Sequence, residues 1–156
     1  MKNEKTKKKT SAKAVPKDFH TVTPFLVVEG AEKFIDFAVK AFGAEKTFLM
    51  KNENGTVSHA TIKIGDSCIM LSDAMENFPA TTSTLYLYVP DADGIYKRAV
   101  DAKATSLREP TDEFWGDRTG GVRDSWGNQW WISTHIEDVS DEELNKRKQE
   151  KQLQDA

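Results

Sequence analysis

Two segments of this chain repeat one another without a gap at an offset of 61 residues, from position 26 to position 87. LVVEGAEKFIDFAVKAFGA (26–44) aligns with LYVPDADGIYKRAVDAKAT (87–105), so that Leu26 matches Leu87 and Thr23, just upstream, matches Thr84. Each copy opens with a β-type run of apolar residues and then changes to a helical period. Because both copies must bury the same face, the repeat restricts the fold to two similar units that share a core.

Each copy is predicted to contain an amphipathic helix directly after its first strand. Asp91 precedes the second helix as an N-cap, and Gly43 follows the first helix, where glycine commonly ends one. The apolar faces consist of Ala31, Phe34, Ile35, Ala38 and Phe42 in the first helix, and of Ala92, Ile95, Ala99 and Ala102 in the second.

Further strands follow each helix, separated by residues that favour tight turns. Asn54-Gly55 and Gly65-Asp66 tolerate the positive φ that hairpin turns require. Trp126-Gly127-Asn128 separates the last two strands of the second copy. The sequence therefore predicts an α+β fold of two βαβββ modules, which form a curved mixed sheet around a cleft with the helices outside.

The 156 residues suit one folded domain, predicted over 20–138, with modules 20–79 and 83–138. Residues 1–19 hold seven lysines against two acidic residues, a balance of +5, so the remaining residues must sum to −8 in a chain of net charge −3. We expect 1–19 to be a disordered basic tail. The acidic body argues against nucleic-acid binding, although a tail that reaches anionic partners is a third hypothesis for function.

The remaining features concern the C-terminus and the cellular compartment. Residues 139–156 are predicted to form a helical appendage that begins at the capping box of Ser140 and Glu143. No apolar run approaches the roughly 18–20 residues that span a bilayer. A single cysteine, Cys68, fits a reducing cytoplasm, and we expect it to be a small buried side chain.

Three strings together resemble the vicinal oxygen chelate superfamily, in its glyoxalase/bleomycin-resistance-like branch, whose members are often labelled demethylubiquinone-methyltransferase-like. They are TVTPFLVVEGAEKFIDFAVKAFGAEK, SHATIKIGDSCIMLSD and FWGDRTGGVRDSWGNQWWISTHIEDVS. The resemblance runs from about Phe19 to Ser140. It implies paired βαβββ modules, which the repeat indicates independently. It also implies a homodimer, by analogy with relatives.

Metal-dependent members of this superfamily hold a divalent ion with side chains from the first and last strand of each module. Carried over, these positions are Thr23, Thr84, Met70 (or Ile69) and Trp131. Hydroxyl, thioether and indole groups are poor ligands for such ions, which prefer carboxylate, imidazole or thiolate. We therefore expect no metal and no cofactor. The three histidines, His20, His59 and His135, show no metal-ligand spacing, so they are expected to be structural or surface residues.

All four tryptophans lie between Trp115 and Trp131. Trp130 and Trp131 must point to opposite faces of one strand. We expect Trp130 to pack under the helices and Trp131 to face the cleft, on the side of Ser133 and His135. An indole wall suits flat or cationic organic molecules, although simple core packing is the alternative.

The WGDR loop supplies two further candidates. Trp115 opens this loop and, of the four tryptophans, is predicted to be the one best placed to touch a ligand or a partner. Arg118 is predicted to hold a carboxylate or phosphate, with a salt bridge to Asp117 or Asp124 as an equally good interpretation.

The first hypothesis for function is a metal-independent protein that binds an unidentified small organic molecule in a Trp-lined cleft. The alternative is a glyoxalase-like lyase or isomerase, or a dioxygenase, with a non-standard metal or acid–base set. Candidates for that set are His59, Glu113 and Asp73, none with a visible partner. The predicted ligand-binding residues are Trp131, Trp115, Arg118, Thr23, Thr84, Met70 and His59.

Overall fold

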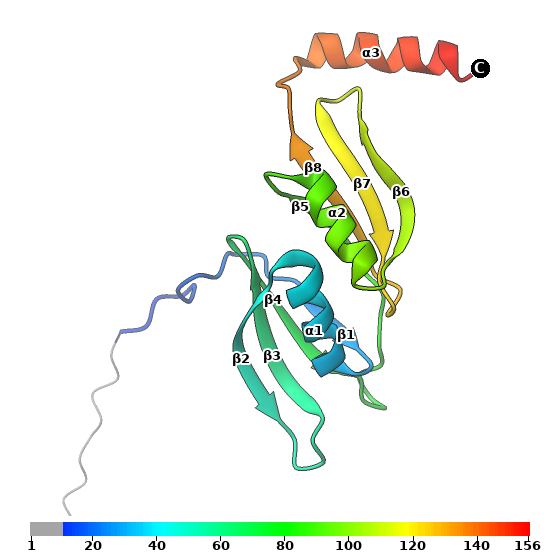
Figure 1. Ribbon diagram of the computed structural model, residues 1–156. Helices are drawn as coiled ribbons and strands as arrows, with labels where there is room; N and C mark the ends of the chain where they lie inside the picture. The colour runs from blue at the N-terminus through cyan, green and yellow to red at the C-terminus, as the bar shows by residue number, and fades with distance from the viewer. Residues whose placement is uncertain (1–10) are drawn as a thin grey trace, which may run out of the picture.

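The computed structural model describes residues 11–156, in which two β-α-β-β-β units follow one another and a C-terminal helix comes last (Figure 1). The first unit consists of β1 (Phe25–Val28), α1 (Ala31–Phe42), β2 (Glu45–Lys51), β3 (Val57–Ile64) and β4 (Ser67–Asp73). The second unit consists of β5 (Thr84–Tyr88), α2 (Ala92–Asp101), β6 (Thr105–Asp112), β7 (Asp117–Arg123) and β8 (Gln129–His135). The last helix is α3 (Asp141–Gln154).

The two units form two four-stranded mixed sheets with the same topology, β1-β4-β3-β2 and β5-β8-β7-β6. In each sheet the first strand pairs parallel to the last, and the remaining pairs are antiparallel. The register repeats as the sequence does, because Phe25 pairs with Met70 in one sheet and Tyr86 with Trp131 in the other. The predicted α+β fold of two βαβββ modules is confirmed.

Local chemistry explains where the first helix begins and ends. The carboxylate of Asp73, at the end of β4, accepts 2.8 Å hydrogen bonds from the N–H groups of Gly30 and Ala31 at the start of α1. Gly43 has a φ of 65° and ends the helix in the left-handed region, as predicted. The expected apolar face of α1 is buried throughout.

The two modules meet through their helices and through tryptophans of the second module. Both α1 and α2 lie on the same side of the molecule, each over its own sheet (Figure 1). Trp130 is fully buried, with its ring centroid 4.4 Å from that of Phe42 and 6.4 Å from that of Phe34, both on α1. The prediction that Trp130 packs under the helices is therefore confirmed, and it joins the two halves of the core.

The turn before β8 is held by Asp124, which is itself buried. Its carboxylate accepts hydrogen bonds from the backbone N–H groups of Trp126 and Asn128, and from Nε1 of Trp130. Nε1 of Trp126 in turn donates to the carbonyl oxygen of Glu29 in the first module, at 2.6 Å. The cluster of tryptophans therefore has a structural role in the turn and at the boundary between the modules.

No strand of one sheet pairs with a strand of the other within residues 11–156. Each sheet consequently has one face covered by its helix and a second face, called here the open face, on the far side.

The C-terminal helix begins at the predicted cap, where Oγ of Ser140 accepts a hydrogen bond from the N–H of Glu143. It buries no side chain and extends beyond the second module (Figure 1). Arg147 joins it to the preceding segment by an ion pair with Glu137, and also pairs with Glu143 within the helix. Within residues 11–156 no helix has the length and apolar character needed to cross a bilayer.

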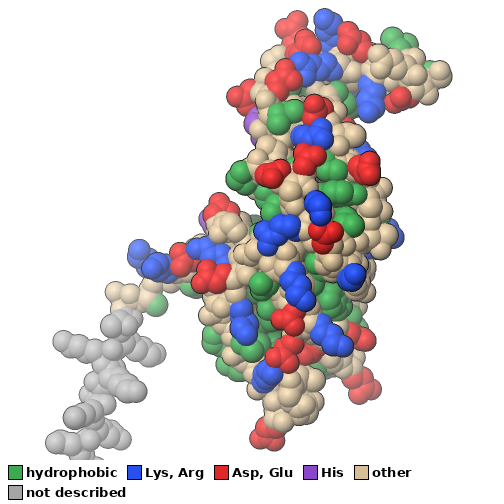
Figure 2. Space-filling view, in the orientation of Figure 1, with side chains coloured by type: hydrophobic (Ala, Val, Ile, Leu, Met, Phe, Trp, Pro, Cys, Tyr) green, Lys and Arg blue, Asp and Glu red, His purple; other side chains and the backbone are tan. Residues whose placement is uncertain are grey.

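Figure 2 shows acidic and basic side chains interspersed over the face that carries α1 and α2. Residues 1–10, where most lysines of the predicted basic tail occur, lie outside the described residues.

Candidate functional site

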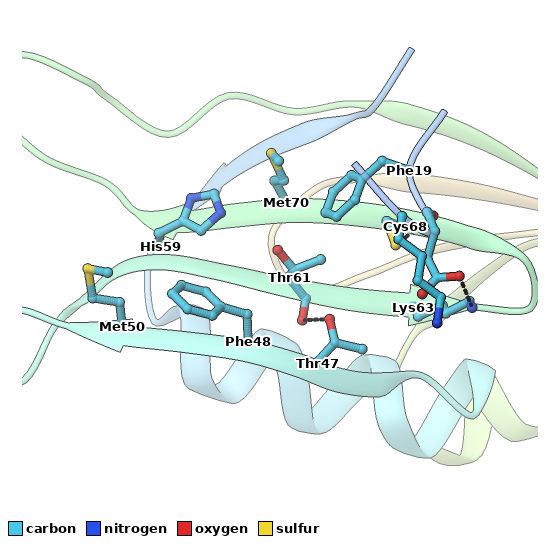
Figure 3. Close-up of a pocket in the computed structure, with 11 residues that line it drawn as sticks. Phe19, Thr47, Phe48, Met50, His59, Thr61, Lys63, Cys68 and Met70 are labelled. Atoms are coloured by element: carbon cyan, nitrogen blue, oxygen red, sulfur yellow. Dashed lines mark hydrogen bonds and ion pairs between the residues drawn. The ribbon is translucent and has the colours of Figure 1, made fainter. Parts of the chain in front are cut away.

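A cavity of about 560 Å³ lies on the open face of the first sheet, on the opposite side from α1 (Figure 3). Most of its accessible lining is apolar, and a few polar side chains face it. This composition is typical of sites that bind small organic molecules. The lining residues are Lys17, Asp18, Phe19, Thr47, Phe48, Met50, His59, Thr61, Lys63, Cys68 and Met70.

The floor of the cavity follows from the alternation of side chains along β3 and β4. His59, Thr61 and Lys63 occupy every second position of β3 and therefore share one face. Met70 of β4 pairs with Thr61 and faces the same side. Cys68 is buried, as the sequence predicted, and lies two residues before Met70 on this face.

The wall formed by β2 depends on an irregularity at Thr47. The register shifts between Lys46 and Phe48, so Phe48 pairs with Thr61 and Met50 pairs with His59. An extra residue in one strand reverses the face that later side chains occupy. Phe48 and Met50 thereby line the cavity, and both remain about half exposed.

His59 and Lys63 lie toward opposite ends of the cavity, with Thr61 between them (Figure 3). At one end the imidazole of His59 lies between two rings, with centroid distances of 5.7 Å to Phe25 and 5.8 Å to Phe48. At the other end Nζ of Lys63 is 3.8 Å from Oδ1 of Asp18.

The segment that contains Lys17, Asp18 and Phe19 lies against this second end of the cavity. The thiol of Cys68 donates to the carbonyl oxygen of Asp18 at 3.3 Å. Part of the chain assigned to the basic tail thus lies against the sheet and completes the cavity.

A second cluster of polar side chains lies on the open face of the second sheet, around the buried carboxylate of Asp117. Oδ2 of Asp117 accepts hydrogen bonds from the hydroxyls of Tyr86 and Tyr88 and from Nε1 of Trp115, at 3.0–3.2 Å. Oδ1 lies 2.8 Å from Nδ1 of His135. Four donors from two strands and a loop therefore surround one anion and fix the orientation of two exposed tyrosine rings.

The protonation states of this cluster follow from its contacts. The hydrogen bond to Asp117 raises the pKa of His135 above its ordinary value, and a 2.7 Å contact of Nε2 with Asp138 adds to this effect. Burial alone would raise the pKa of Asp117, but the donated hydrogen bonds, first that of His135, outweigh burial and hold the pKa below its usual value. The pKa of Tyr88 is raised, chiefly because its hydroxyl donates to Asp117.

Trp131 lies on the side of β8 opposite to Trp130, as predicted, and its indole packs over the backbone of Gly121 on the neighbouring strand β7. The guanidinium of Arg108 lies 5.3 Å from the centroid of the indole. A flat, electron-rich surface covered by a cation is a favourable arrangement in proteins. One face of the Trp131 indole therefore packs on its own sheet, and Arg108 of the same sheet lies against the ring.

The predicted ligand-binding residues divide between separate places. His59 and Met70 line the cavity of the first module. Trp115 and Trp131 belong to the second module. Thr23 lines a smaller hollow between the modules, and its hydroxyl donates to the carbonyl oxygen of His20. Ligand binding by each of these residues stays a prediction.

Thr84 and Arg118 complete the predicted set. Thr84 begins β5, opposite Gln129. Arg118 pairs with Asp93 of α2 and with Asp112. The salt bridge considered for Arg118 is therefore present, but with these two carboxylates and not with Asp117 or Asp124. Its predicted contact with a ligand is untested, and its guanidinium is occupied on the helix side of the sheet.

The side chains at the positions implied for a metal are poor ligands for a divalent ion. The hydroxyl of Thr23 is engaged with a carbonyl oxygen, Met70 offers a thioether, and the indole of Trp131 covers Gly121. Among residues 11–156 no group of three or more His, Cys, Asp or Glu side chains is arranged to hold a metal ion. The donor chemistry at these positions does not fit the metal of metal-dependent relatives.

The acid–base candidates of the sequence have structural partners or a place in the cavity. Glu113 forms an ion pair with Arg108. Asp73 caps α1 and also accepts a 2.7 Å hydrogen bond from the N–H of Val57. Of the three, His59 is the one that lines the cavity of the first module. The Asp117–His135 pair has no signal in the sequence, because the two residues lie 18 positions apart on antiparallel strands.

Comparison with known proteins places the fold in a family. The chain contains two βαβββ modules, and a cavity large enough for a small molecule lies on the sheet face opposite the helix of the first module. It is therefore a protein of paired βαβββ modules. The sequence model of the Glyoxalase/Bleomycin resistance protein/Dioxygenase superfamily matches residues 19–132, and the chain belongs to this superfamily. The resemblance to the vicinal oxygen chelate superfamily is therefore confirmed.

Relatives in sequence and in structure agree with this placement. An uncharacterized protein of Mycobacterium bovis is 32% identical over 134 residues, which cover 79% of this chain and 88% of that protein. TioX from a Micromonospora species has a similar structure, with a TM-score of 0.64, 24% identity, and coverage of 74% of this chain and 99% of that chain. A putative 3-demethylubiquinone-9 3-methyltransferase, PhnB protein, from Bacillus cereus has a TM-score of 0.57 at 21% identity, with coverage of 74% and 99%. At such identities these structures support the fold alone.

Proposed function

We propose that this protein binds a small organic molecule with a flat apolar body in the cavity on the open face of β2, β3 and β4. The observation that carries the proposal is the cavity itself, about 560 Å³ in volume and walled by Phe19, Phe48, Met50 and Met70. Aromatic and thioether side chains adapt to flat ligands through dispersion contacts. Burial of such a ligand would remove apolar surface of both partners from water.

We propose further that binding needs no metal. The support is chemical: threonine, methionine and tryptophan occupy the positions implied for ligands, as described above. A side chain of the cavity itself, such as the His59 imidazole between its two rings, is then left to orient a ligand by hydrogen bonding.

The contribution of Trp131 to ligand binding depends on a further proposal, that the protein is a homodimer. Each open face carries exposed apolar side chains, among them Phe48 and Met50 on the first sheet and Tyr86 and Tyr88 on the second. If the second sheet of one copy covered the first sheet of another, these faces would become buried and Trp131 would approach the cavity.

We also propose a cytoplasmic location, which rests on the single buried cysteine.

Two methionines of the first module allow a matched test of the cavity. Met50 lines the cavity and Met75 does not, and their exposed fractions are 53% and 51%. We expect Met50→Glu to weaken binding of the neutral fluorescent probe phenylnaphthylamine by about tenfold or more, because a carboxylate would be desolvated beside it. Met75→Glu should leave the affinity unchanged. Equal effects of the two substitutions, or none, would contradict the proposed site.

The Asp117–His135 pair supports a second candidate function, a lyase or isomerase that transfers a proton without a metal. Asp117 holds Nδ1 of His135, so Nε2 could exchange a proton with a bound molecule in place of its contact with the exposed Asp138. Exchange of carbon-bound hydrogen in small 2-oxo compounds dissolved in D2O, followed by NMR, tests this candidate. Exchange that is absent in the wild type, or that persists in His135→Gln, would exclude it.

A further inference from the structure

We infer that the molecule bound in the cavity of the first module is an organic anion, whose charged group is held by Lys63 at the end where Asp18 lies. This inference deepens the proposed function and rests on it. It depends on three observations: the sign of charge around the cavity, the unsatisfied state of the lysine, and the way in which Asp18 is held.

The charge of the cavity lining is opposite to that of the protein body. The lining contains two lysines, Lys17 and Lys63, and one carboxylate, Asp18, whereas residues 20–156 carry a net charge of −8. Four other hollows of the described surface have linings whose formal charge is zero or negative. The largest of them has a volume of about 700 Å³ and is lined by two aspartates without a lysine or arginine. A positive lining on an acidic protein favours an anion at this place.

Among residues 11–156 the ammonium group of Lys63 has no partner closer than the carboxylate of Asp18. Its nitrogen lies 3.8 Å from Oδ1 of Asp18, beyond the 2.7–2.9 Å typical of a charge-assisted hydrogen bond. The side chain is only 30% exposed, so contact with water is restricted. An ammonium group has three donors, and a carboxylate, sulfonate or phosphate of a ligand would satisfy them better than Asp18 does.

Asp18 is held through its backbone and not through its carboxylate. Its φ of 68° lies in the left-handed region, which aspartate adopts more often than most non-glycine residues. Its carbonyl oxygen accepts a hydrogen bond from the thiol of Cys68 at 3.3 Å. Within residues 11–156 the ion pair of the Asp18 carboxylate is the 3.8 Å contact with Lys63, so an anionic ligand that also fills the apolar part of the cavity would displace this carboxylate.

The shape of the cavity determines where the charge of the ligand lies. Lys63 lies toward one end, beside Phe19 and Cys68, and the aromatic and methionine walls continue toward His59 (Figure 3). The ligand is therefore an amphipathic anion, with an acidic group at one end of a flat apolar body. An organic cation would find Asp18 as its counter-ion, but it would also meet the two lysines.

Two fluorescent probes with the same aromatic skeleton test this inference on the full-length protein. Anilinonaphthalene sulfonate carries an acidic group and phenylnaphthylamine does not. We expect the wild type to bind the sulfonate more tightly. Lys63→Met should weaken the affinity for the sulfonate by about tenfold and change the affinity for the neutral probe by less than about twofold. Lys63→Gln, which removes the charge but keeps a polar side chain, should change the two affinities in the same way. Asp18→Asn should strengthen binding of the sulfonate.

The controls separate this inference from the proposed site. Lys97→Met removes an exposed lysine on α2, paired with Asp101, and should change neither affinity. Met50→Glu should weaken both probes, because both would occupy the cavity. If the neutral probe binds and the sulfonate does not, or if loss of Lys63 affects both probes equally, the ligand is not an anion held by Lys63. If neither probe binds, the proposed cavity itself is wrong and the inference falls with it.

Discussion

The contact between Trp131 and Gly121 gives a prediction whose size can be derived from the structure. A Cβ atom built on Gly121 would lie 2.5, 2.7 and 2.9 Å from three carbons of the six-membered ring of Trp131. Real Cβ contacts are essentially never shorter than 3.0 Å. The indole cannot retreat freely, because the guanidinium of Arg108 lies 5.3 Å from its centroid. Gly121→Ala must therefore displace the indole or the strand.

We expect Gly121→Ala to lower the free energy of unfolding by about 1–3 kcal/mol, the usual cost of one extra methyl group in a filled space. Urea denaturation followed by circular dichroism measures this change. The backbone φ of Gly121 is not positive, so the cost is steric and not conformational. Removal of the indole should therefore abolish the destabilisation caused by Gly121→Ala.

The double variant decides between these explanations. In a Trp131→Ala background, Gly121→Ala should cost nothing, or should stabilise by a few tenths of a kcal/mol because alanine restricts the unfolded chain. If Gly121→Ala costs as much in the Trp131→Ala background as in the wild type, the stacking of Trp131 on Gly121 is not the reason for glycine at this position.

Two other predictions concern the carboxylate of Asp73 and the pairing of His135 with Asp117. Asp73→Ala should destabilise the fold by about 2–4 kcal/mol, because Asp73 accepts hydrogen bonds from two N–H groups at the start of α1 and from Val57; thermal and urea unfolding measure the loss, and a change below about 0.5 kcal/mol would contradict it. The raised pKa of His135 beside Asp117 and Asp138 means that its contribution to stability is complete below the unfolded-state pKa of about 6.5 and is lost as pH rises through the folded-state pKa. His135→Gln should therefore destabilise the protein more at pH 6 than at pH 9, in unfolding curves recorded at both values, and a larger effect at pH 9 would refute this assignment.

The sequence was sufficient for the architecture because the repeat reports on packing that both modules share. Leu26 and Leu87 occupy equivalent places in equivalent strands, and the opposite directions of Trp130 and Trp131 follow from strand alternation alone. Such regularities depend on residues close together in the chain, or on residues that repeat at a fixed offset.

The candidate sites were less predictable because they depend on irregularities and on contacts distant in sequence. The bulge at Thr47, which turns Phe48 toward the cavity, has no clear signal in the sequence. Asp18 reaches Cys68 from 50 residues away, which the expectation of a disordered tail did not anticipate. The salt bridge considered as one alternative for Arg118 was with Asp117 or Asp124, whereas the structure pairs Arg118 with Asp93 on α2 and with Asp112.

The most direct test of the central claim, that the cavity of the first module holds a flat organic molecule, uses the methionines of the chain. Protein labelled with carbon-13 in its methionine methyl groups gives one NMR signal for each of four methionines. On titration with phenylnaphthylamine, ring currents from a bound probe should shift the signals of Met50 and Met70, which line the cavity, with one common affinity. The signal of Met75, outside the lining, should change little. A saturable shift confined to Met75, or no shift of Met50 and Met70 when the probe is bound, would contradict the assignment of the site.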